Sequence, residues 1–195
     1  MFNQIDRCLP EKYMADLEEI VYEMPMYYSI NTSYAPEDKN FDYWNQQLRN
    51  SSIIDNGQFT HAVFHKGEIF SKYYGLIYPI LYLFADRAGI TVNNIERIRV
   101  NLLLRDKTFT TENYNFPHSD RDGKYVFLYY INDADGDTVL FNEYDNMKTV
   151  PDKFTVDKRI SPCRGRGIFF ESMRFHASCN PSVSQHRYVI NFNFD

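Results

Sequence analysis

The sequence has little cysteine and no apolar run long enough to cross a bilayer. Its three cysteines, Cys8, Cys163 and Cys179, are an odd number without C-x-x-C spacing, which argues against a disulfide framework or a zinc knuckle. The longest apolar stretch, Tyr73 to Ala85, holds about a dozen residues around Pro79, and acidic residues occupy the region where a secretory signal would be apolar. We therefore expect a cytoplasmic protein that does not enter membranes.

The sequence also lacks an excess of positive charge. Lys and Arg number 21 against 26 Asp and Glu, which gives a formal net charge of −5, so the chain as a whole has no attraction for nucleic-acid backbones. It contains no internal repeat, low-complexity tract or linker, and its 195 residues predict a single domain. No feature indicates an oligomeric state. What is abundant is aromatic: 16 Tyr and 16 Phe favour half-buried strands.

Residues 1–90 have mainly helical patterns. Apolar residues recur at three- and four-residue steps in Glu11 to Met24, and Asp42 to Leu48 could add a short helix. The run Ser71 to Arg87, which ends at Gly89, predicts the most apolar helix. The polar loop Asn50 to Gly57 lies between them and could cover a site. Helical support is therefore the expected role of residues 1–90.

Residues 91–195 have the texture of a β structure, with short apolar or alternating runs separated by Asn, Asp, Gly and Pro. The predicted strands are Ile95 to Leu104, Tyr125 to Ile131, Thr138 to Asn142, Gly167 to Phe170 and Arg187 to Phe194. Helices packed on one twisted β structure give an α+β fold that is mainly β.

Two histidines and an aspartate could form a metal site. In an extended segment, residues two apart project to the same face, so His118 and Asp120 can bind one ion together. A β-rich run, residues 167–175, would deliver His176 to the end of another strand. Two His and one carboxylate form the facial triad typical of non-haem Fe(II). The alternative is that His118 is a loop residue and His176 a packed core residue.

Arg187 opens the last predicted strand, in which residues 187, 189, 191 and 193 share one face. A guanidinium directed inward needs an anionic partner, because an unpaired buried charge is costly. A carboxylate of a small cosubstrate would supply that partner in a bidentate contact. The alternative is a surface arginine or a structural salt bridge with a nearby aspartate.

The ordered set of motifs resembles the Fe(II)/2-oxoglutarate-dependent oxygenases, and within them the prolyl 4-hydroxylase-like branch, including small phage-borne members. The resemblance covers about residues 95–194 and rests on these segments: His118-Ser-Asp120, Tyr125-Val-Phe-Leu-Tyr-Tyr-Ile-Asn-Asp133, Gly136-Asp-Thr-Val-Leu-Phe141, Pro162-x-x-Gly165-x-Gly-Ile-Phe-Phe170, His176-Ala-Ser-Cys-Asn-Pro181 and Arg187-Tyr-Val-Ile-Asn191.

This resemblance implies a double-stranded β-helix, a jelly-roll barrel of the cupin type, buttressed by the N-terminal helices. It implies that His118, Asp120 and His176 bind Fe(II). It further implies that Arg187 and Tyr130 hold the distal carboxylate of the cosubstrate 2-oxoglutarate, while Tyr129 faces the other way. Two weaker expectations for the cosubstrate pocket are Thr138, which could equally be a plain strand residue, and Asn101. Tyr114 could shape the pocket from its loop.

The activity implied by the resemblance is that of a dioxygenase, which hydroxylates an unactivated C–H bond with O₂ and 2-oxoglutarate and releases succinate and CO₂. A peptidyl proline is the substrate that the branch suggests, and other protein or small-molecule substrates stay open. The basic segment Lys153 to Arg174 could instead attract an anionic substrate such as a nucleotide, or be a solvated face. Two other functions keep the same barrel: a binding module without catalysis, and a cupin dioxygenase independent of 2-oxoglutarate. The presence of both Arg187 and Tyr130 favours the 2-oxoglutarate-dependent dioxygenase over these two alternatives.

Overall fold

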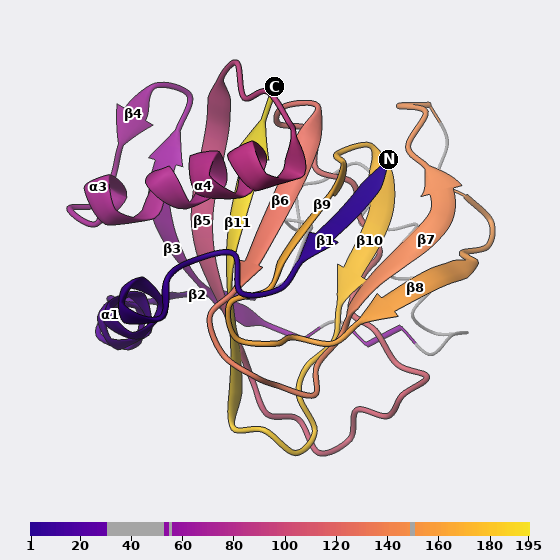
Figure 1. Ribbon diagram of the computed structural model, residues 1–195. Helices are drawn as coiled ribbons and strands as arrows, with labels where there is room; N and C mark the ends of the chain where they lie inside the picture. The colour runs from indigo at the N-terminus through magenta and orange to yellow at the C-terminus, as the bar shows by residue number, and fades with distance from the viewer. Residues whose placement is uncertain (31–52, 55, 149–150) are drawn as a thin grey trace.

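The computed structural model describes residues 1–30, 53–54, 56–148 and 151–195, and it consists of two facing β-sheets with helices packed on the larger one (Figure 1). The strands are β1 (Phe2–Ile5), β2 (Tyr27–Ser29), β3 (Gln58–His65), β4 (Glu68–Ile69), β5 (Ile95–Leu104), β6 (Tyr125–Tyr130), β7 (Thr138–Tyr144), β8 (Val156–Ile160), β9 (Gly167–Glu171), β10 (Arg174–Ser178) and β11 (His186–Phe194). The larger sheet has the order β1-β9-β6-β11-β5-β3-β2, with β4 paired to β3, and the smaller has the order β10-β7-β8. All recorded pairings between strands are antiparallel.

Alternation along the central strands separates two faces of the larger sheet. On β11, Ile190, Phe192 and Phe194 belong to the core cluster that the helices share, whereas Val189 belongs to the cluster between the two sheets. Tyr129 and Tyr130 divide in the same way, Tyr129 toward the helices and Tyr130 toward the barrel interior, as expected. Because side chains alternate at every residue, one strand supplies both the helix-facing core and the lining of the barrel.

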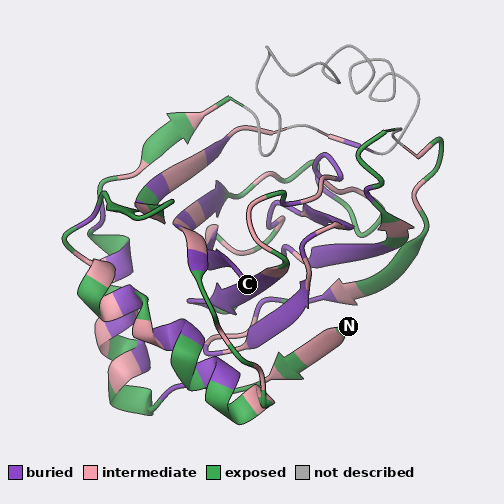
Figure 2. Ribbon diagram, turned by 90° about the horizontal axis from the view of Figure 1, so that it is seen from above, coloured by how far each residue is buried: buried purple, intermediate pink, exposed green. Residues whose placement is uncertain are grey.

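The helices are α1 (Glu11–Tyr22), α3 (Tyr74–Ile77) and α4 (Pro79–Ala88). They cover one face of the larger sheet, and α1 and α4 each have a buried side and an exposed side (Figure 2). The single helix expected from Ser71 to Arg87 is two helices, because Pro79 has no N–H to continue the helical hydrogen bonds and instead occupies the first turn of α4. Gly89 ends α4 at φ 65°, in the left-handed conformation that glycine adopts without strain, as predicted.

The five predicted strands are confirmed as β5, β6, β7, β9 and β11, with small shifts at the ends. The prediction of mainly helical support from residues 1–90 is incomplete, because β1, β2, β3 and β4 also lie there and join the larger sheet. β3 is hard to predict from the sequence because its residue His61 is polar yet buried. The ring nitrogen Nδ1 of His61 lies 2.8 Å from the carbonyl of Pro25, and Nε2 lies 2.8 Å from the hydroxyl of Ser71. The helix expected over Asp42 to Leu48 lies outside the described residues, as does part of the Asn50 to Gly57 loop.

Two further observations bear on the expectations about compartment. Cys8, Cys163 and Cys179 are all free thiols. Over the described residues, no helix is long and apolar enough to cross a membrane.

Candidate functional site

His118 and His176 are joined through their backbones. Each donates its N–H to the other's carbonyl, at 2.9 Å from the nitrogen of His118 and 2.8 Å from that of His176, in an isolated antiparallel bridge. The ring centroids are 4.4 Å apart. The sequence predicted that His176 lies at the end of a strand. It lies instead in the middle of β10. The bridge fixes the two imidazoles side by side without any ligand.

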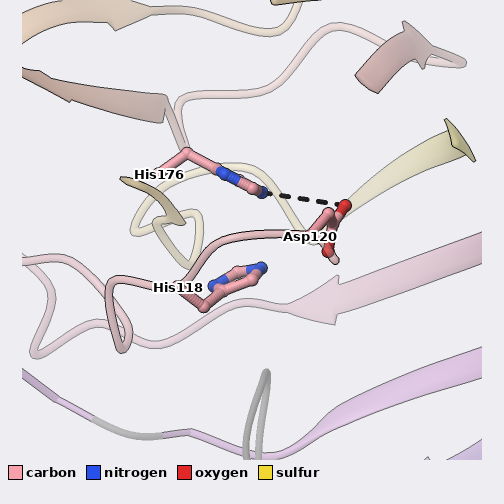
Figure 3. Close-up of side chains that lie close together, drawn as sticks. All are labelled: His118, Asp120 and His176. Carbon is pink, nitrogen blue, oxygen red and sulfur yellow. Dashed lines mark ion pairs between the residues drawn. The ribbon is translucent and has the colours of Figure 1, made fainter. Parts of the chain in front are cut away.

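Asp120 completes the cluster, two residues after His118. One ligand atom from each of the three side chains lies within 4.8 Å of the others, and Figure 3 shows the two imidazoles and the carboxylate converging on one point. Asp120 Oδ2 is 4.0 Å from His176 Nε2. Within the described residues, this is the one group of His, Cys, Asp or Glu side chains arranged to hold a metal ion.

The hydrogen bonds of both histidines leave the same ring nitrogen available. Nδ1 of His118 lies 3.0 Å from the carbonyl of Phe116, and Nδ1 of His176 lies 3.0 Å from that of Arg174. A carbonyl only accepts, so each Nδ1 donates a proton and each Nε2 keeps its lone pair. Burial lowers the pKa of His118, and burial together with His118 lowers the pKa of His176 to about 4. Both rings are therefore neutral near pH 7, as metal ligands must be.

Asp120 is held in its ionised form by its surroundings. Burial alone would raise the pKa of Asp120, but Arg97 and the two imidazoles, with a hydrogen bond from Asn193, bring it well below its usual range. Arg97 Nη2 lies 3.0 Å from Oδ1, while Asn191 and Asn193 each donate to Oδ2 at 3.0 Å. The carboxylate is thus oriented by β5 and β11 at once. Neutral imidazole nitrogens with one carboxylate are the donor set that non-haem Fe(II) takes.

Arg187 lies in the same cavity, whose volume is about 50 Å³. The side chain is only 2% exposed, its Nη2 donates to Thr138 Oγ1 at 2.7 Å, and its buried Nε has no hydrogen-bond partner. No carboxylate of the described residues forms an ion pair with it, so the structural salt bridge considered as the alternative is absent there. Among the described residues this buried guanidinium therefore has no counter-ion, and a bound anion would supply one.

Tyr130 and Thr138 lie beside this guanidinium. The Tyr130 hydroxyl donates to Thr138 Oγ1 at 2.6 Å, and the Arg187 guanidinium lies 5.6 Å from the Tyr130 ring centre. Burial raises the pKa of Tyr130, so its hydroxyl stays protonated. Because Thr138 Oγ1 accepts from both Tyr130 and Arg187, its own proton remains to be donated to a ligand. The three residues form a pocket wall suited to a carboxylate.

Asn101 also lines the cavity, and its buried Oδ1 has no hydrogen-bond partner. Tyr114, by contrast, packs on Phe141, with ring centres 5.1 Å apart, and does not line the cavity. Its carbonyl accepts from the N–H of Ile54 at 3.0 Å, which joins the described part of the Asn50 to Gly57 loop to the segment before His118.

The sequence analysis did not identify the three side chains that contact the carboxylate of Asp120, which are Arg97, Asn191 and Asn193. The alternation of β11 had already placed 191 and 193 on the face of Arg187, which was the available signal for the two asparagines. Arg97 lies directly opposite Asn193 in the β5–β11 pairing. That pairing across about 96 intervening residues has no local signature in the sequence.

Three arginines of the basic segment Lys153 to Arg174 are held by acidic residues. Arg164 pairs with Glu11 and Glu18, each at 2.7 Å, and Arg166 pairs with Asp6 at 2.6 Å. Arg174 is buried against Asp157. These ion pairs connect the N-terminal region and β8 to the barrel, and they reduce the charge that the segment can present to a polyanion.

The comparisons agree with this geometry. The family model of the 2OG-Fe(II) oxygenase superfamily matches residues 107–195, which contain His118, Asp120, His176 and Arg187. No curated protein sequence matches the chain.

Among solved structures, an oxidoreductase of the 2OG-Fe(II) oxygenase family from Burkholderia pseudomallei is 12% identical, with a TM-score of 0.64 over 99% of this chain and 84% of that one. A prolyl hydroxylase from Trichoplax adhaerens, solved with a hypoxia inducible factor peptide fragment, is 16% identical, with a TM-score of 0.59 over 99% and 82%. A prolyl-4-hydroxylase from Pseudomonas putida is 13% identical, with a TM-score of 0.54 over 99% and 91%.

At these identities the solved structures show the fold, and the family model adds the class. The predicted double-stranded β-helix and the predicted family are therefore confirmed, while the resemblance to phage-borne members stays a prediction. Residues 107–195 thus belong to the 2OG-Fe(II) oxygenase superfamily, the class of oxygenases that uses Fe(II), 2-oxoglutarate and O₂, and they carry the His-Asp-His group.

Proposed function

We propose that His118, Asp120 and His176 bind Fe(II), and that Arg187 binds the distal carboxylate of 2-oxoglutarate. The observation that carries the proposal is Arg187 itself, which is buried next to the imidazole cluster without an anionic partner among the described residues. A surface arginine or a plain binding barrel would not need this arrangement. Tyr130 and Thr138 support the same carboxylate with hydroxyl groups, and the unpartnered Oδ1 of Asn101 is available to accept a hydrogen bond from a ligand in the cavity.

When bound, iron with 2-oxoglutarate and O₂ supplies the oxidising chemistry, and the chain's residues position these groups. The two Nδ1–H···O=C hydrogen bonds direct the Nε2 atoms of His118 and His176 toward the cavity. Arg97 and the paired asparagines keep Asp120 ionised and oriented. The apolar side chains of Leu103, Leu128 and Val189 line the remaining wall and limit the access of water.

The reaction that we favour is hydroxylation of an unactivated C–H bond, with a peptidyl proline as the first substrate to examine. The support is the likeness of the fold to two prolyl hydroxylases, one of them solved with a peptide fragment. The pairing of Arg164, Arg166 and Arg174 with acidic residues speaks against a nucleic-acid substrate. The free thiols are in keeping with the predicted cytoplasmic location.

The test is to incubate the Fe(II)-loaded protein with O₂ and 2-oxoglutarate, and to measure succinate with and without a library of proline-containing peptides. We expect succinate to form, and one or more peptides to accelerate it while gaining the mass of one oxygen atom. If iron is bound but no succinate forms under any condition, the chain is a binding module. If a substrate is oxidised without consumption of 2-oxoglutarate, the chain is a dioxygenase independent of that cosubstrate.

A further inference from the structure

Like Arg187, Arg99 lies near the site without an acidic partner among the described residues, and the proposed function does not use it. Residues 97, 99, 101 and 103 of β5 share one face of the strand by alternation. On that face, Arg97 contacts Asp120, while Asn101 and Leu103 line the cavity. Arg99 therefore lies between the residue that holds the metal-binding carboxylate and the residues that line the pocket.

The neighbours of Arg99 on the adjacent strands carry no charge. In register, Arg99 is opposite Asn191 on β11, which lines the cavity and bonds to Asp120. On β3 it is opposite Ala62, which is small and exposed. The long side chain of Arg99 thus starts next to a residue of the cavity wall, and neither register partner can neutralise its charge.

The carboxylates near Arg99 are already engaged by other cations. Arg97 contacts Asp120 at 3.0 Å and Asp122 at 3.4 Å, and Lys66 lies 3.6 Å from Asp122. His65 Nε2 is 3.9 Å from the same carboxylate. Over the described parts of the chain, no hydrogen bond or ion pair holds the guanidinium of Arg99.

Arg99 is nevertheless only half exposed. Burial and repulsion from Arg97 lower its pKa, against weaker opposing effects of Asp120 and Asp122. By contrast, Arg164, Arg166 and Arg174 contact acidic residues, and half-buried Arg159 donates to Cys179 and to the carbonyl of Asn113. A partly dehydrated arginine that is repelled by a neighbour and lacks an acid is suited to bind an oxyanion.

We propose that Arg99 binds an oxyanionic group of the primary substrate, a carboxylate or a phosphate, beside the metal site. This inference rests on the proposed function of the site. Arg99 is distinct from the proposed cosubstrate anchor, because Arg187 is opposite Leu103, four residues further along β5 and roughly 13 Å away by the rise of a strand. The pocket would therefore select substrates that carry a negative charge near the oxidised carbon.

The experiment uses the full chain loaded with Mn(II), which is paramagnetic, and saturated with 2-oxoglutarate without O₂. The probes are inorganic phosphate, followed by ³¹P NMR, and ¹³C-labelled acetate, followed by ¹³C NMR. We expect the Mn(II) to broaden the signal of at least one probe. Arg99→Gln should weaken the binding of that probe to the protein by roughly 10- to 100-fold, the usual effect of losing a charge-assisted contact. The probe that is broadened more identifies the oxyanion as phosphate or carboxylate.

Arg105→Gln is the matched control, because Arg105 is exposed just beyond β5, and it should leave the broadening unchanged. The inference is overturned if neither probe is broadened in the unaltered chain, or if Arg99→Gln broadens as strongly as the unaltered chain. It is also overturned if Arg99→Gln weakens the binding of 2-oxoglutarate itself, since Arg99 would then hold the cosubstrate. Failure of the unaltered chain to bind 2-oxoglutarate would instead refute the proposed function, which the same samples report separately.

Discussion

Arg97 and Asn193 face each other across β5 and β11, and both also contact Asp120. Arg97 Nε donates to Asn193 Oδ1 at 2.9 Å, while Arg97 Nη2 and Asn193 Nδ2 each lie 3.0 Å from a carboxylate oxygen of Asp120. The three groups form a closed network in which no member can rotate without breaking two contacts. We therefore propose a positioning role for Arg97 toward the carboxylate of Asp120, the proposed metal ligand.

Arg97→Gln should weaken Fe(II) binding by about 10- to 100-fold, the usual effect of removing a residue that orients a metal ligand. Because the pair with Asp120 is buried, unfolding should also become easier, by about 3 kcal/mol. Anaerobic metal titration and urea denaturation measure the two effects. Arg121→Gln is the control, since Arg121 is half exposed against Asp145 and should change neither quantity appreciably. Unchanged Fe(II) affinity in Arg97→Gln would refute the positioning role.

Asp120→Ala should abolish Fe(II) binding and succinate formation while the fold persists. The carboxylate is one of three proposed ligands, and losing its pair with Arg97 should lower stability as Arg97→Gln does, while the apolar core clusters stay intact. Circular dichroism checks the fold, and metal content after dialysis checks the site. Asp16→Ala, on the exposed side of α1, should retain full metal content. Retained turnover in Asp120→Ala would show that another residue is the carboxylate ligand.

Arg187→Gln should raise the 2-oxoglutarate requirement by roughly 10- to 150-fold, because a desolvated charge-assisted contact contributes about 1.5–3 kcal/mol. Fe(II) affinity should change far less, since Arg187 contacts none of the three proposed ligands. Arg187→Lys keeps the charge but loses the planar guanidinium, so its 2-oxoglutarate requirement should lie between those of the unaltered chain and Arg187→Gln. The KM for 2-oxoglutarate in the three proteins measures the effect, and equal values would place the cosubstrate anchor elsewhere.

The sequence predicted the barrel and the site better than it predicted the first 90 residues. The alternation of β5, β6 and β11 is strong because each strand separates an apolar helix-facing side from the barrel interior. β3 and β10 are harder to recognise because their buried faces carry polar side chains, such as His61 and Arg174, whose partners lie elsewhere in the chain. Arg97 was missed for the same reason, since its role depends on a partner that only strand pairing brings near.

Asp135 provides a test that depends on pH. Its carboxylate accepts hydrogen bonds from the N–H groups of Ser182, Val183 and Ser184, just before β11, which carries Arg187. These bonds outweigh the effect of burial and hold the pKa of Asp135 well below its usual value of 3.8. The folded-state pKa is depressed, so the stabilisation is complete above pH 3.8 and is lost as the pH falls through the folded-state value.

Asp135→Asn should therefore be less stable than the unaltered chain by about 1 kcal/mol near neutral pH, the size of a typical helix-cap hydrogen bond. The difference should shrink as the pH falls below 3.8. Urea denaturation of both proteins at several pH values measures it. A difference that stays constant down to the lowest pH would show that the charge of Asp135 contributes nothing.

The most direct test of the central claim is an anaerobic titration of the chain with Fe(II) and then with 2-oxoglutarate, followed by visible absorption. Chelation of 2-oxoglutarate to iron at the His118, Asp120 and His176 site should produce a weak metal-to-ligand charge-transfer band at one equivalent of iron. The band should require Asp120, and in Arg187→Gln it should appear only at much higher 2-oxoglutarate concentration. Iron bound at this site without the band, or a band unaffected by Asp120→Ala, would contradict the account.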